Sequence, residues 1–315
     1  MISVRPASAH LGADVSGLSF AEIVDRDDPD LFAQVSAALD RHLVLRFRDQ
    51  PVDPERFVAF ARHFGTLVNL KRAENVDALH VEEHPLIKVI SNAYAADGRP
   101  LGDVNNSSQQ IWHSDGCTQP APPAKTFFFG RKAPANPPRT MWLHMVEVFR
   151  RMPEDLKATI TPLSAIHSVH NNPNEIALFL RRGSIGMDKL REGTRHPLVC
   201  RHPSTGKPLL YLPRRRDTLI VGMDLAESRE IMDRLWDFVL TQTCWWGAGM
   251  AENDLVIWDN LATLHGREGW ESTEERVMWH VATTGTPLLA ACGDGDGGTV
   301  ERASAEQHLL TPLLV

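Results

Sequence analysis

The stretch "IWHSDGC" at residues 111–117 places two potential metal ligands, His113 and Asp115, on either side of one serine. If this stretch is extended, the two side chains point to the same face, because side chains alternate along a strand. A mononuclear iron(II) oxygenase uses two imidazoles and one carboxylate on one face of the metal. A His-x-Asp tripeptide is also common in surface turns, so this interpretation requires a third ligand elsewhere in the chain.

The candidate for the third ligand is His265, in "DLVIWDNLATLHGREGW". It lies 152 residues after His113, so only tertiary folding can bring the two imidazoles together. Eleven residues further on, Arg276 begins a β-rich run, and a strand, a loop and a returning strand would place it alongside His265. A guanidinium binds a carboxylate through two parallel hydrogen bonds. Each of these residues alone is more often structural, but the four in this order favour a metal site beside a carboxylate-binding group.

The composition is that of an ordinary globular protein. The chain has 315 residues, of which 43% are hydrophobic and 23% charged, so it can bury a large core. The net charge of -7 comes without a basic block, and nothing therefore favours nucleic acid as a partner. We expect residues 1–315 to form a single domain, whose exposed helical regions allow a homodimer or a tetramer.

The sequence carries no signal for secretion or membrane insertion. The N-terminal segment lacks the charged, apolar and small-residue regions of a secretory signal, and no run approaches about 18 apolar residues. The cysteines are dispersed without a C-x-x-C pair, which argues against a zinc knuckle or a disulfide framework; they are Cys117, Cys200, Cys244 and Cys292. We expect a cytoplasmic protein with no membrane partner.

The elements that must position these residues begin with a helix, a strand and a helix. Apolar residues recur at helical spacing in 28–42, a buried strand is predicted in 42–50, and a helix in 53–65 opens with Asp53 as N-cap and Pro54 at its first position. From residue 85 onward short β-rich runs dominate, interrupted by an amphipathic helix at 228–243. The runs are 85–92, 125–132, 139–145, 165–170, 196–203, 208–212, 217–223, 254–260 and 276–285.

Many short strands with few helices indicate a mainly β fold with flanking helices, a β-sandwich or barrel. The residues around "PSTGKP" at 203–208 are typical of a hairpin turn. The polar, Gly-containing segment 93–110 immediately precedes the His-x-Asp tripeptide, and we expect it to form a lid, with a passive connection as the alternative. Residues 288–315 form a C-terminal extension, either a flexible tail or a docking arm.

The order of these motifs resembles the taurine dioxygenase / 2,4-dichlorophenoxyacetate dioxygenase family of iron(II)- and 2-oxoglutarate-dependent oxygenases, over roughly residues 3–287. The resemblance implies that His113, Asp115 and His265 bind iron(II), and that Arg276 and Thr140 bind the distal carboxylate of 2-oxoglutarate. It also implies a double-stranded β-helix, the jelly roll of cupin-like proteins. It is carried by "LGADVSG" (11–17), "VLRFRDQPVDPERFVAFARHFG" (44–65), "WHSD" (112–115), Thr140 with Trp142, "HPLVCRHPSTGKPLLYL" (196–212), "LVIWDN" (255–260) and the spacing from His265 to Arg276.

The implied reaction consumes the co-substrates 2-oxoglutarate and O2, oxidises a small organic substrate, and releases succinate and CO2. Hydroxylation is the default outcome, but desaturation, ring closure or oxidative cleavage would use the same ligands. Related halogenases replace the carboxylate ligand with a small residue so that chloride can bind. Because Asp115 is present, halogenation is disfavoured.

The expected substrate pocket departs from the taurine pattern of the family. His280 stands where taurine dioxygenase has an arginine that binds the sulfonate, Leu70 where it has a histidine, and Gln109 where it has an asparagine. We therefore expect that taurine is not the substrate. The consecutive residues Arg214, Arg215 and Arg216 offer an anionic substrate a partner, although such a run is usually solvated.

Two other functions fit part of the pattern. A zinc-dependent hydrolase also uses histidine and aspartate ligands, but it leaves Arg276 and Thr140 without a role. A non-catalytic β-sandwich protein that binds a metal or a small molecule is the alternative outside enzymes, because a fold does not fix a function. It predicts an incomplete or distorted metal site.

Overall fold

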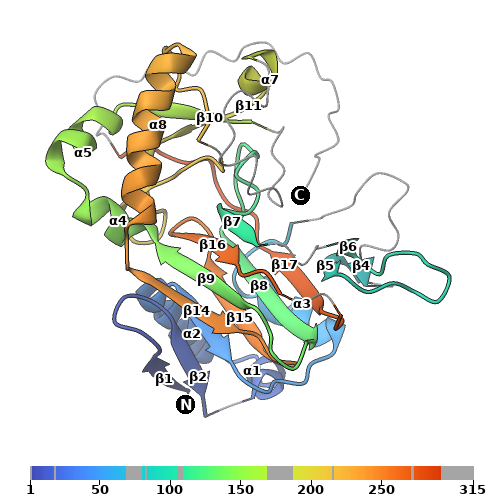
Figure 1. Ribbon diagram of the computed structural model, residues 1–315. Coiled ribbons are helices and arrows are strands. Elements are labelled where there is room, and N and C mark those ends of the chain that lie inside the picture. Colours follow the sequence, from blue (N-terminus) through green and yellow to red (C-terminus); the bar gives the residue numbers. More distant parts are fainter. Residues whose placement is uncertain are drawn as a thin grey trace.

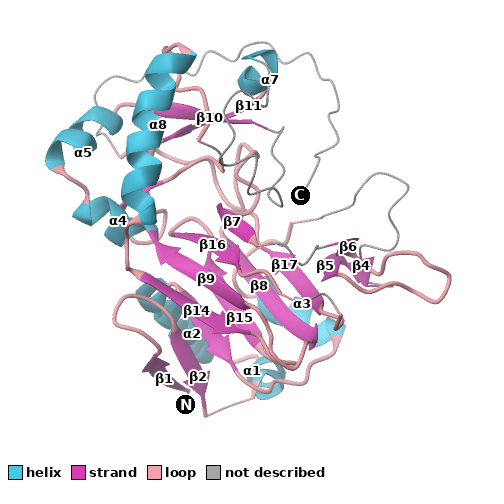
Figure 2. Cartoon of the chain, in the orientation of Figure 1, coloured by secondary structure: helices cyan, strands magenta, loops and turns pink. Residues whose placement is uncertain are grey.

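The computed structural model describes residues 2–17, 19–68, 80–81, 84–104, 109–168, 187–214, 216–270 and 273–291. Strands dominate the lower part of the molecule in Figure 1, and helices with two small sheets form the upper part. The expected mainly β architecture with flanking helices is confirmed at this level (Figure 2). None of the described helices has the length and apolar character needed to span a membrane.

The larger sheet has nine strands within the described residues. In the central strands, side chains alternate between two buried faces: Phe127, Phe129 and Ile257 point to one face, and Phe128 and Trp258 point to the other. Burial on both faces explains why these strands are unbroken apolar runs in the sequence. The spatial order is β1 (Ser3–Pro6), β2 (Ala13–Ser16), β3 (Val44–Phe47), β15 (Leu255–Asp259), β8 (Lys125–Lys132), β17 (Val277–Ala282), β5 (His84–Ser91) and β4 (His80–Val81), with β6 (Asp103–Val104) beside β5.

Three helices cover the first of these faces: α1 (Phe20–Arg26), α2 (Pro29–His42) and α3 (Pro54–Arg62). Asp28 and Asp53 cap α2 and α3, and each helix has proline at its start. The predicted helices at 28–42 and 53–65 are confirmed, although α3 ends at Arg62, three residues before Gly65. The strand predicted in 42–50 is β3.

A four-stranded sheet lies against the second face. Its strands, in order, are β14 (Trp245–Gly249), β9 (Arg139–His144), β16 (Thr263–Arg267) and β7 (Gln110–His113). Trp142 of β9 packs with Phe128, Trp258 and Met278 of the larger sheet, and its ring centroid lies 5.8 Å from that of Trp258. The two sheets therefore pack face to face across an apolar layer.

The N-terminal strands seal one edge of this layer. Gly12 has a φ of 85°, and a Cβ placed there would lie 2.6 Å from the ring of Trp246. Trp246 in turn stacks on Trp142, with 5.5 Å between the ring centroids. Only glycine permits both this left-handed backbone and this close approach to the tryptophan pair.

The upper part of the molecule has a separate hydrophobic cluster, in which Trp236 and Leu235 of α8 pack on Leu198 and Val199. The helix predicted at 228–243 begins earlier and ends earlier, because Asp224 and Glu227 form a capping box. The predicted hairpin at 203–208 is confirmed between β12 and β13. The elements are α4 (Met145–Arg151), α5 (Glu154–Ile160), α7 (Met187–Arg191), α8 (Leu225–Leu240), and the strand pairs β10 (Ser164–Ser168) with β11 (Gly193–Pro197) and β12 (Val199–Arg201) with β13 (Pro208–Leu210).

The strand predicted at 217–223 is wrong. Within this run only Ile220 pairs with another strand, as an isolated bridge to Ala165. The Asp217 carboxylate instead accepts a hydrogen bond from Arg229 of α8 at 2.7 Å, and Gly222 has a φ of 85° that breaks an extended chain. The run is a loop that leads into α8; Ile220 packs in the upper cluster, and Val221 is exposed.

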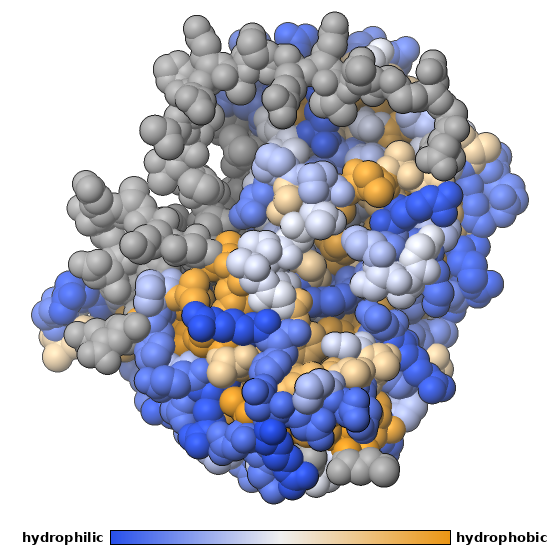
Figure 3. Space-filling model, turned by 180° about the vertical axis from the view of Figure 1, so that it is seen from behind, coloured by the Kyte–Doolittle hydropathy of each residue, from blue (hydrophilic) through white to orange (hydrophobic). Residues whose placement is uncertain are grey.

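The large hydrophobic side chains that are exposed among the described residues are few and come from separate elements. Seen from behind, hydrophobic residues emerge between hydrophilic ones (Figure 3). Of the expected lid at 93–110, residues 105–108 lie outside the described part, and so do residues 292–315 of the expected C-terminal extension. The exposed large hydrophobic residues come from separate elements: Tyr94, Leu101, Val221, Leu240, Trp245 and Leu289.

A buried charge network fixes the end of β15. The carboxylate of Asp259 forms an ion pair with Lys125 and a hydrogen bond with His202, whose Nε2 lies 2.9 Å from Oδ2. Its other oxygen accepts hydrogen bonds from the backbone N–H groups of Leu261 and Ala262. Burial alone would raise the pKa of Asp259, but Lys125 and His202 outweigh burial and hold that pKa well below its usual range. Asp259 therefore stays ionised and shapes the turn between β15 and β16.

Replacing Asp259 by Asn should lower the free energy of unfolding by about 3 kcal/mol, because it leaves the charge of Lys125 without its buried partner. Urea unfolding at pH 7, followed by tryptophan fluorescence, measures this. Asp25→Ala, which breaks an exposed ion pair with Arg56, is the control and should have a much smaller effect. Equal effects of the two substitutions would contradict this role of the network. Because the pKa of Asp259 is lowered on folding, the difference from the natural protein should shrink as the pH falls below 4.

Candidate metal and co-substrate site

His113 and His265 lie side by side at the inner face of the four-stranded sheet. They are direct cross-strand partners in the antiparallel pair of β7 and β16, so their side chains project to the same face. The two ring centroids are 4.1 Å apart. The register between two strands therefore closes the gap of 152 residues noted in the sequence.

The carboxylate of Asp115 completes the group. Its Oδ1 lies 3.8 Å from Nε2 of His113 and 3.6 Å from Nε2 of His265. Each of the three residues offers one potential ligand atom, and these three atoms all lie within 4.8 Å of one another. Two atoms that each lie about 2.1 Å from one metal ion are at most about 4.2 Å apart, so both carboxylate distances fit a shared ion.

Asp115 reaches this position from a turn, because β7 ends at His113. The extended conformation considered for 111–117 is therefore wrong beyond His113. Asn260 holds the turn: its Oδ1 accepts a hydrogen bond from the backbone N–H of Asp115 at 2.8 Å, and its Nδ2 donates to the carbonyls of Asp115 and Pro123. Ser114 adds a hydrogen bond from its hydroxyl to the carbonyl of Asn260 at 2.6 Å. The sequence analysis missed Asn260, although it belongs to the quoted "LVIWDN".

The protonation states suit a metal. Burial lowers the pKa of His265 to about 4. Burial also lowers the pKa of His113 well below its usual value, and the neighbouring His265 and Arg214 add to this effect. Burial would raise the pKa of Asp115, but the histidines around it, His265 first, hold it well below its usual range. Two neutral imidazoles and an ionised carboxylate are the forms that bind a divalent metal.

The hydrogen bonds also leave the right atoms for a metal. Nδ1 of His113 lies 2.8 Å from the carbonyl of Ile111, which assigns the proton to Nδ1 and turns the lone pair of Nε2 toward Asp115. Within the described part of the chain, Nδ1 of His265 is buried without a hydrogen-bond partner. The second oxygen of Asp115 faces Thr126 and His280. Two lone pairs and one carboxylate oxygen thus converge on one point, an arrangement that a cation stabilises.

Arg276 supplies a buried positive charge in the facing sheet. It immediately precedes β17, and its backbone N–H donates to Oδ1 of Asn92 at 2.7 Å. Its side chain is 3% exposed and lies over the rings of Phe128 and Trp270. Burial, followed by the nearby Arg267, lowers its pKa to about 9, so it remains mostly protonated at neutral pH. Among the described residues no carboxylate pairs with it.

The strand that follows Arg276 does not pair with the strand of His265, contrary to expectation. A returning strand beside that of His265 was predicted, but β16 pairs with β7 and β9, whereas β17 pairs with β5 and β8. The two residues therefore stand on facing sheets. Thr140 is buried on β9, two residues from Trp142, the cross-strand partner of His265, and so shares the inner face of the smaller sheet with that histidine.

Of the three residues expected to contact substrate, His280 lies at the site, Gln109 is exposed, and Leu70 is outside the described residues. His280 of β17 lies with Nε2 3.4 Å from Oδ2 of Asp115, so it borders the group of potential ligands. Gln109 is exposed directly before β7, and Leu70 lies outside the described residues. The expectation of a solvated arginine run at 214–216 is wrong for Arg214, which is buried; Arg216 pairs with Asp237 of α8, and Arg215 lies outside the described residues.

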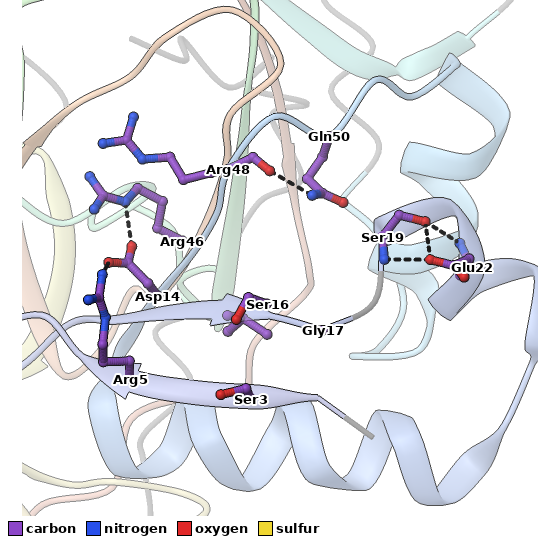
Figure 4. A pocket seen from close by; sticks show the side chains of 11 residues that line it. Ser3, Arg5, Asp14, Ser16, Gly17, Ser19, Glu22, Arg46, Arg48 and Gln50 are labelled. Atoms are coloured by element: carbon purple, nitrogen blue, oxygen red, sulfur yellow. Dashed lines mark hydrogen bonds and ion pairs between the residues drawn. The ribbon is translucent and has the colours of Figure 1, made fainter.

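A hollow of about 650 Å³ between the N-terminal strands and β3 is separate from this site (Figure 4). Its lining shares no residue with His113, Asp115, His265 or Arg276. Its charged side chains are paired with one another or with neighbours, as Arg46 is with Asp14 at 2.7 Å and Arg48 with Asp254 at 2.9 Å. With these charges already compensated, the hollow shows no built site for a charged ligand.

Replacing Asn260 by Ala should weaken metal binding by about 10-fold to 100-fold, because the turn that carries Asp115 loses three hydrogen bonds. Titration with Mn²⁺ followed by electron paramagnetic resonance measures the affinity. Gln109→Ala removes an exposed amide near the same turn and should leave the affinity unchanged. An unchanged affinity in the Asn260 variant would contradict the positioning role of this residue.

Comparison with known proteins agrees with this geometry. Residues 3–282 match the family model described as "Taurine catabolism dioxygenase TauD, TfdA family". A curated relative from Delftia acidovorans, "(S)-phenoxypropionate/alpha-ketoglutarate-dioxygenase", is 30% identical over 290 residues, which cover 91% of this chain and 96% of the relative. Pentalenolactone F synthase from Streptomyces avermitilis is 27% identical over 295 residues, covering 88% of this chain and 92% of the relative.

Solved structures show the same likeness. The crystal structure of a taurine dioxygenase from Burkholderia xenovorans superposes with a TM-score of 0.72 and 26% identity, covering 92% of this chain and 91% of that one. The match of the family model extends over nearly all of the described chain, and it includes the segments that bear His113, Asp115, His265 and Arg276. The chain therefore belongs to the TauD, TfdA family of alpha-ketoglutarate-dependent, that is 2-oxoglutarate-dependent, dioxygenases.

Proposed function

We propose that His113, Asp115 and His265 bind the ferrous iron of this dioxygenase and that Arg276 and Thr140 bind the distal carboxylate of 2-oxoglutarate. The observation that carries the proposal is the convergence of Nε2 of His113, Nε2 of His265 and Oδ1 of Asp115 from two paired strands and one fastened turn. Ferrous iron with 2-oxoglutarate and O2 supplies an oxidation that releases succinate and CO2 and oxidises a small organic substrate.

The chain's own residues prepare this chemistry. His113 and His265 offer neutral nitrogen donors, and Asp115 offers one negative charge through Oδ1, because its Oδ2 is engaged by His280 and Thr126. A ferrous ion held by these three residues would keep further coordination positions free for the co-substrates. Arg276 provides the counter-charge for a dicarboxylic keto acid at a place where burial strengthens the attraction.

Aromatic rings of the layer between the sheets border this site, at which the Asp115 side chain is 20% exposed. The ring centroid of Trp258 lies 5.0 Å from that of His265. The ring centroid of Phe128 lies 6.1 Å from that of His280 and 5.5 Å from the guanidinium carbon of Arg276. These rings shield the charged groups and so increase the strength of each ionic contact. We also propose that the two facing sheets form a double-stranded β-helix, with β8, β15, β17 and β5 opposite β14, β9, β16 and β7.

The arrangement favours this function over the alternatives. A zinc hydrolase would have no use for the buried charge of Arg276, whereas a keto acid with a distal carboxylate requires it. The carboxylate of Asp115 occupies the position that a halide would need, so we propose oxidation without halogenation. Hydroxylation, desaturation, ring closure and oxidative cleavage all use the same ligands, and hydroxylation is the outcome we propose first.

Adding ferrous iron and 2-oxoglutarate to the protein without oxygen should produce a weak visible metal-to-ligand charge-transfer band. His113→Ala and His265→Ala should abolish the band, because each removes one of three ligands. Arg276→Ala should weaken 2-oxoglutarate binding by about 30-fold or more, since it removes a buried charge-assisted pair. Arg139→Ala, which breaks an exposed ion pair with Glu268 at the end of the smaller sheet, is the control.

An absent band in the natural protein, together with unchanged 2-oxoglutarate binding in Arg276→Ala, would defeat the proposal. Succinate release that requires ferrous iron and stops without oxygen distinguishes the dioxygenase from a hydrolase. A hydrolase would turn over with zinc under the same anaerobic conditions.

Taurine should stimulate succinate release less than the best substrate found, because His280 is held against Asp115 and no arginine occupies its position. The screen begins with the compounds in the relatives' names, phenoxypropionate and 2,4-dichlorophenoxyacetate. Stimulation by taurine that equals the best hit would refute the pocket argument.

A further inference from the structure

Arg214 is a buried cation beside the ligand turn. The residue lies between β13 and α8 and is 6% exposed. Its Nη2 donates a hydrogen bond to the carbonyl of Ser114 at 3.4 Å. Ser114 is the residue between His113 and Asp115, so the guanidinium touches the backbone of the proposed iron site. After burial, the charge of Arg214 is one of the causes that lower the pKa values of both His113 and His265.

No acidic side chain compensates this charge within the part of the chain that the structure describes. Nε of Arg214 is buried without a hydrogen-bond partner, Nη2 makes one long bond to the carbonyl of Ser114, and the guanidinium also contacts the neutral, buried thiol of Cys117. The loop does contain carboxylate pairs for other arginines: Arg216 pairs with Asp237, and Arg229 with Asp217. A guanidinium stays charged in proteins, and a buried charge without a partner is strongly unfavourable. Arg214 is therefore prepared for an anion that arrives with a ligand.

The surroundings of Arg214 are polar and uncharged. His167 is fully buried, both of its ring nitrogens lack a partner in the described structure, and its ring stacks on Tyr211 at 5.2 Å. Burial, with His196 and Arg214 nearby, lowers the pKa of His167 well below its usual value, so the imidazole is neutral. A neutral imidazole with a free N–H next to a guanidinium is a suitable donor for a second oxygen of an anion.

The other charged groups of the site already have assignments. Asp115 directs Oδ1 to the two histidines and Oδ2 to His280 and Thr126, and it forms no ion pair with Arg214. The distal carboxylate of 2-oxoglutarate is assigned to Arg276 on the facing sheet. An anion that pairs with Arg214 would therefore be one carried by the organic substrate. A carboxylate is the group that matches a guanidinium fork through two parallel hydrogen bonds.

We propose that Arg214 binds the carboxylate of the organic substrate and so selects carboxylic acids over neutral analogues. This inference rests on the proposed function, because it takes His113, Asp115 and His265 as the iron ligands. It makes Arg214 a specificity-determining residue at the ligand turn and leaves Arg276 to the co-substrate.

The test uses the full-length protein with ferrous iron and 2-oxoglutarate under anaerobic conditions. The probes are four acids, phenoxyacetate, 2-phenoxypropionate, 3-phenylpropionate and hexanoate, each paired with its neutral primary amide. Binding is measured by the change that each probe causes in the charge-transfer band, and turnover by succinate release in air. In the natural protein at least one acid should bind about 30-fold to 100-fold more tightly than its amide.

Arg214→Gln should remove this preference, because it should lower the affinity for the acid about 30-fold or more. The affinities for the amide and for 2-oxoglutarate should stay the same. Arg214→Lys keeps the charge without the fork and should restore part of the preference. The matched control is Arg216→Gln, two residues after Arg214, which breaks the ion pair with Asp237. This variant should keep the full preference for the acid. The unchanged band of 2-oxoglutarate in each variant shows that the site is folded.

Several results would overturn the inference. One is a natural protein in which no acid is preferred over its amide. Another is an Arg214→Gln variant that keeps the preference. A third is an Arg214→Gln variant in which 2-oxoglutarate itself binds weakly, because Arg214 would then serve the co-substrate. If the natural protein gives no charge-transfer band at all, the proposed function fails first, so the two failures are distinguishable.

Discussion

The register between β7 and β16 is the constraint on which the site depends. It sets His113 directly opposite His265, and a shift of one residue would turn one of the two imidazoles to the other face of the sheet. The turn that follows β7 is then tied to the turn that follows β15 through Asn260. Two adjacent turns and one strand pair therefore hold three side chains that would otherwise be independent.

The buried charges of the molecule serve two opposite purposes. Asp259 and Lys125 neutralise each other's charge, and His202 adds a hydrogen bond, so this group fixes a turn and leaves no net charge for a ligand. Arg276 and Arg214 have no carboxylate partner in the described chain, so their charges stay available to ligands. Such charges oppose folding, and the large aromatic clusters on either side of the main sheet offset this effect.

Much of the scaffold is predictable from sequence because its causes are local. Asp28 and Asp53 with their following prolines mark two helices, and the apolar runs of β8 and β15 mark strands covered on both faces. The histidines and Asp115 were also found from residue types and order. Their arrangement was not, because the role of Asn260 and the placement of β16 and β17 on different sheets depend on contacts between distant segments. The burial of Arg214 was missed for the same reason: three consecutive arginines carry no local sign that one of them turns inward.

The origin of the three proposed iron ligands has a consequence for biosynthesis. His265 lies on β16, which is made long after β7, so a nascent chain that ends before residue 263 holds at most two of the three donors. The complete set of donors therefore exists only after β16 has been made and has paired with β7. The interleaved order of the strands thereby makes the proposed iron site one of the last features of the chain to be completed during synthesis.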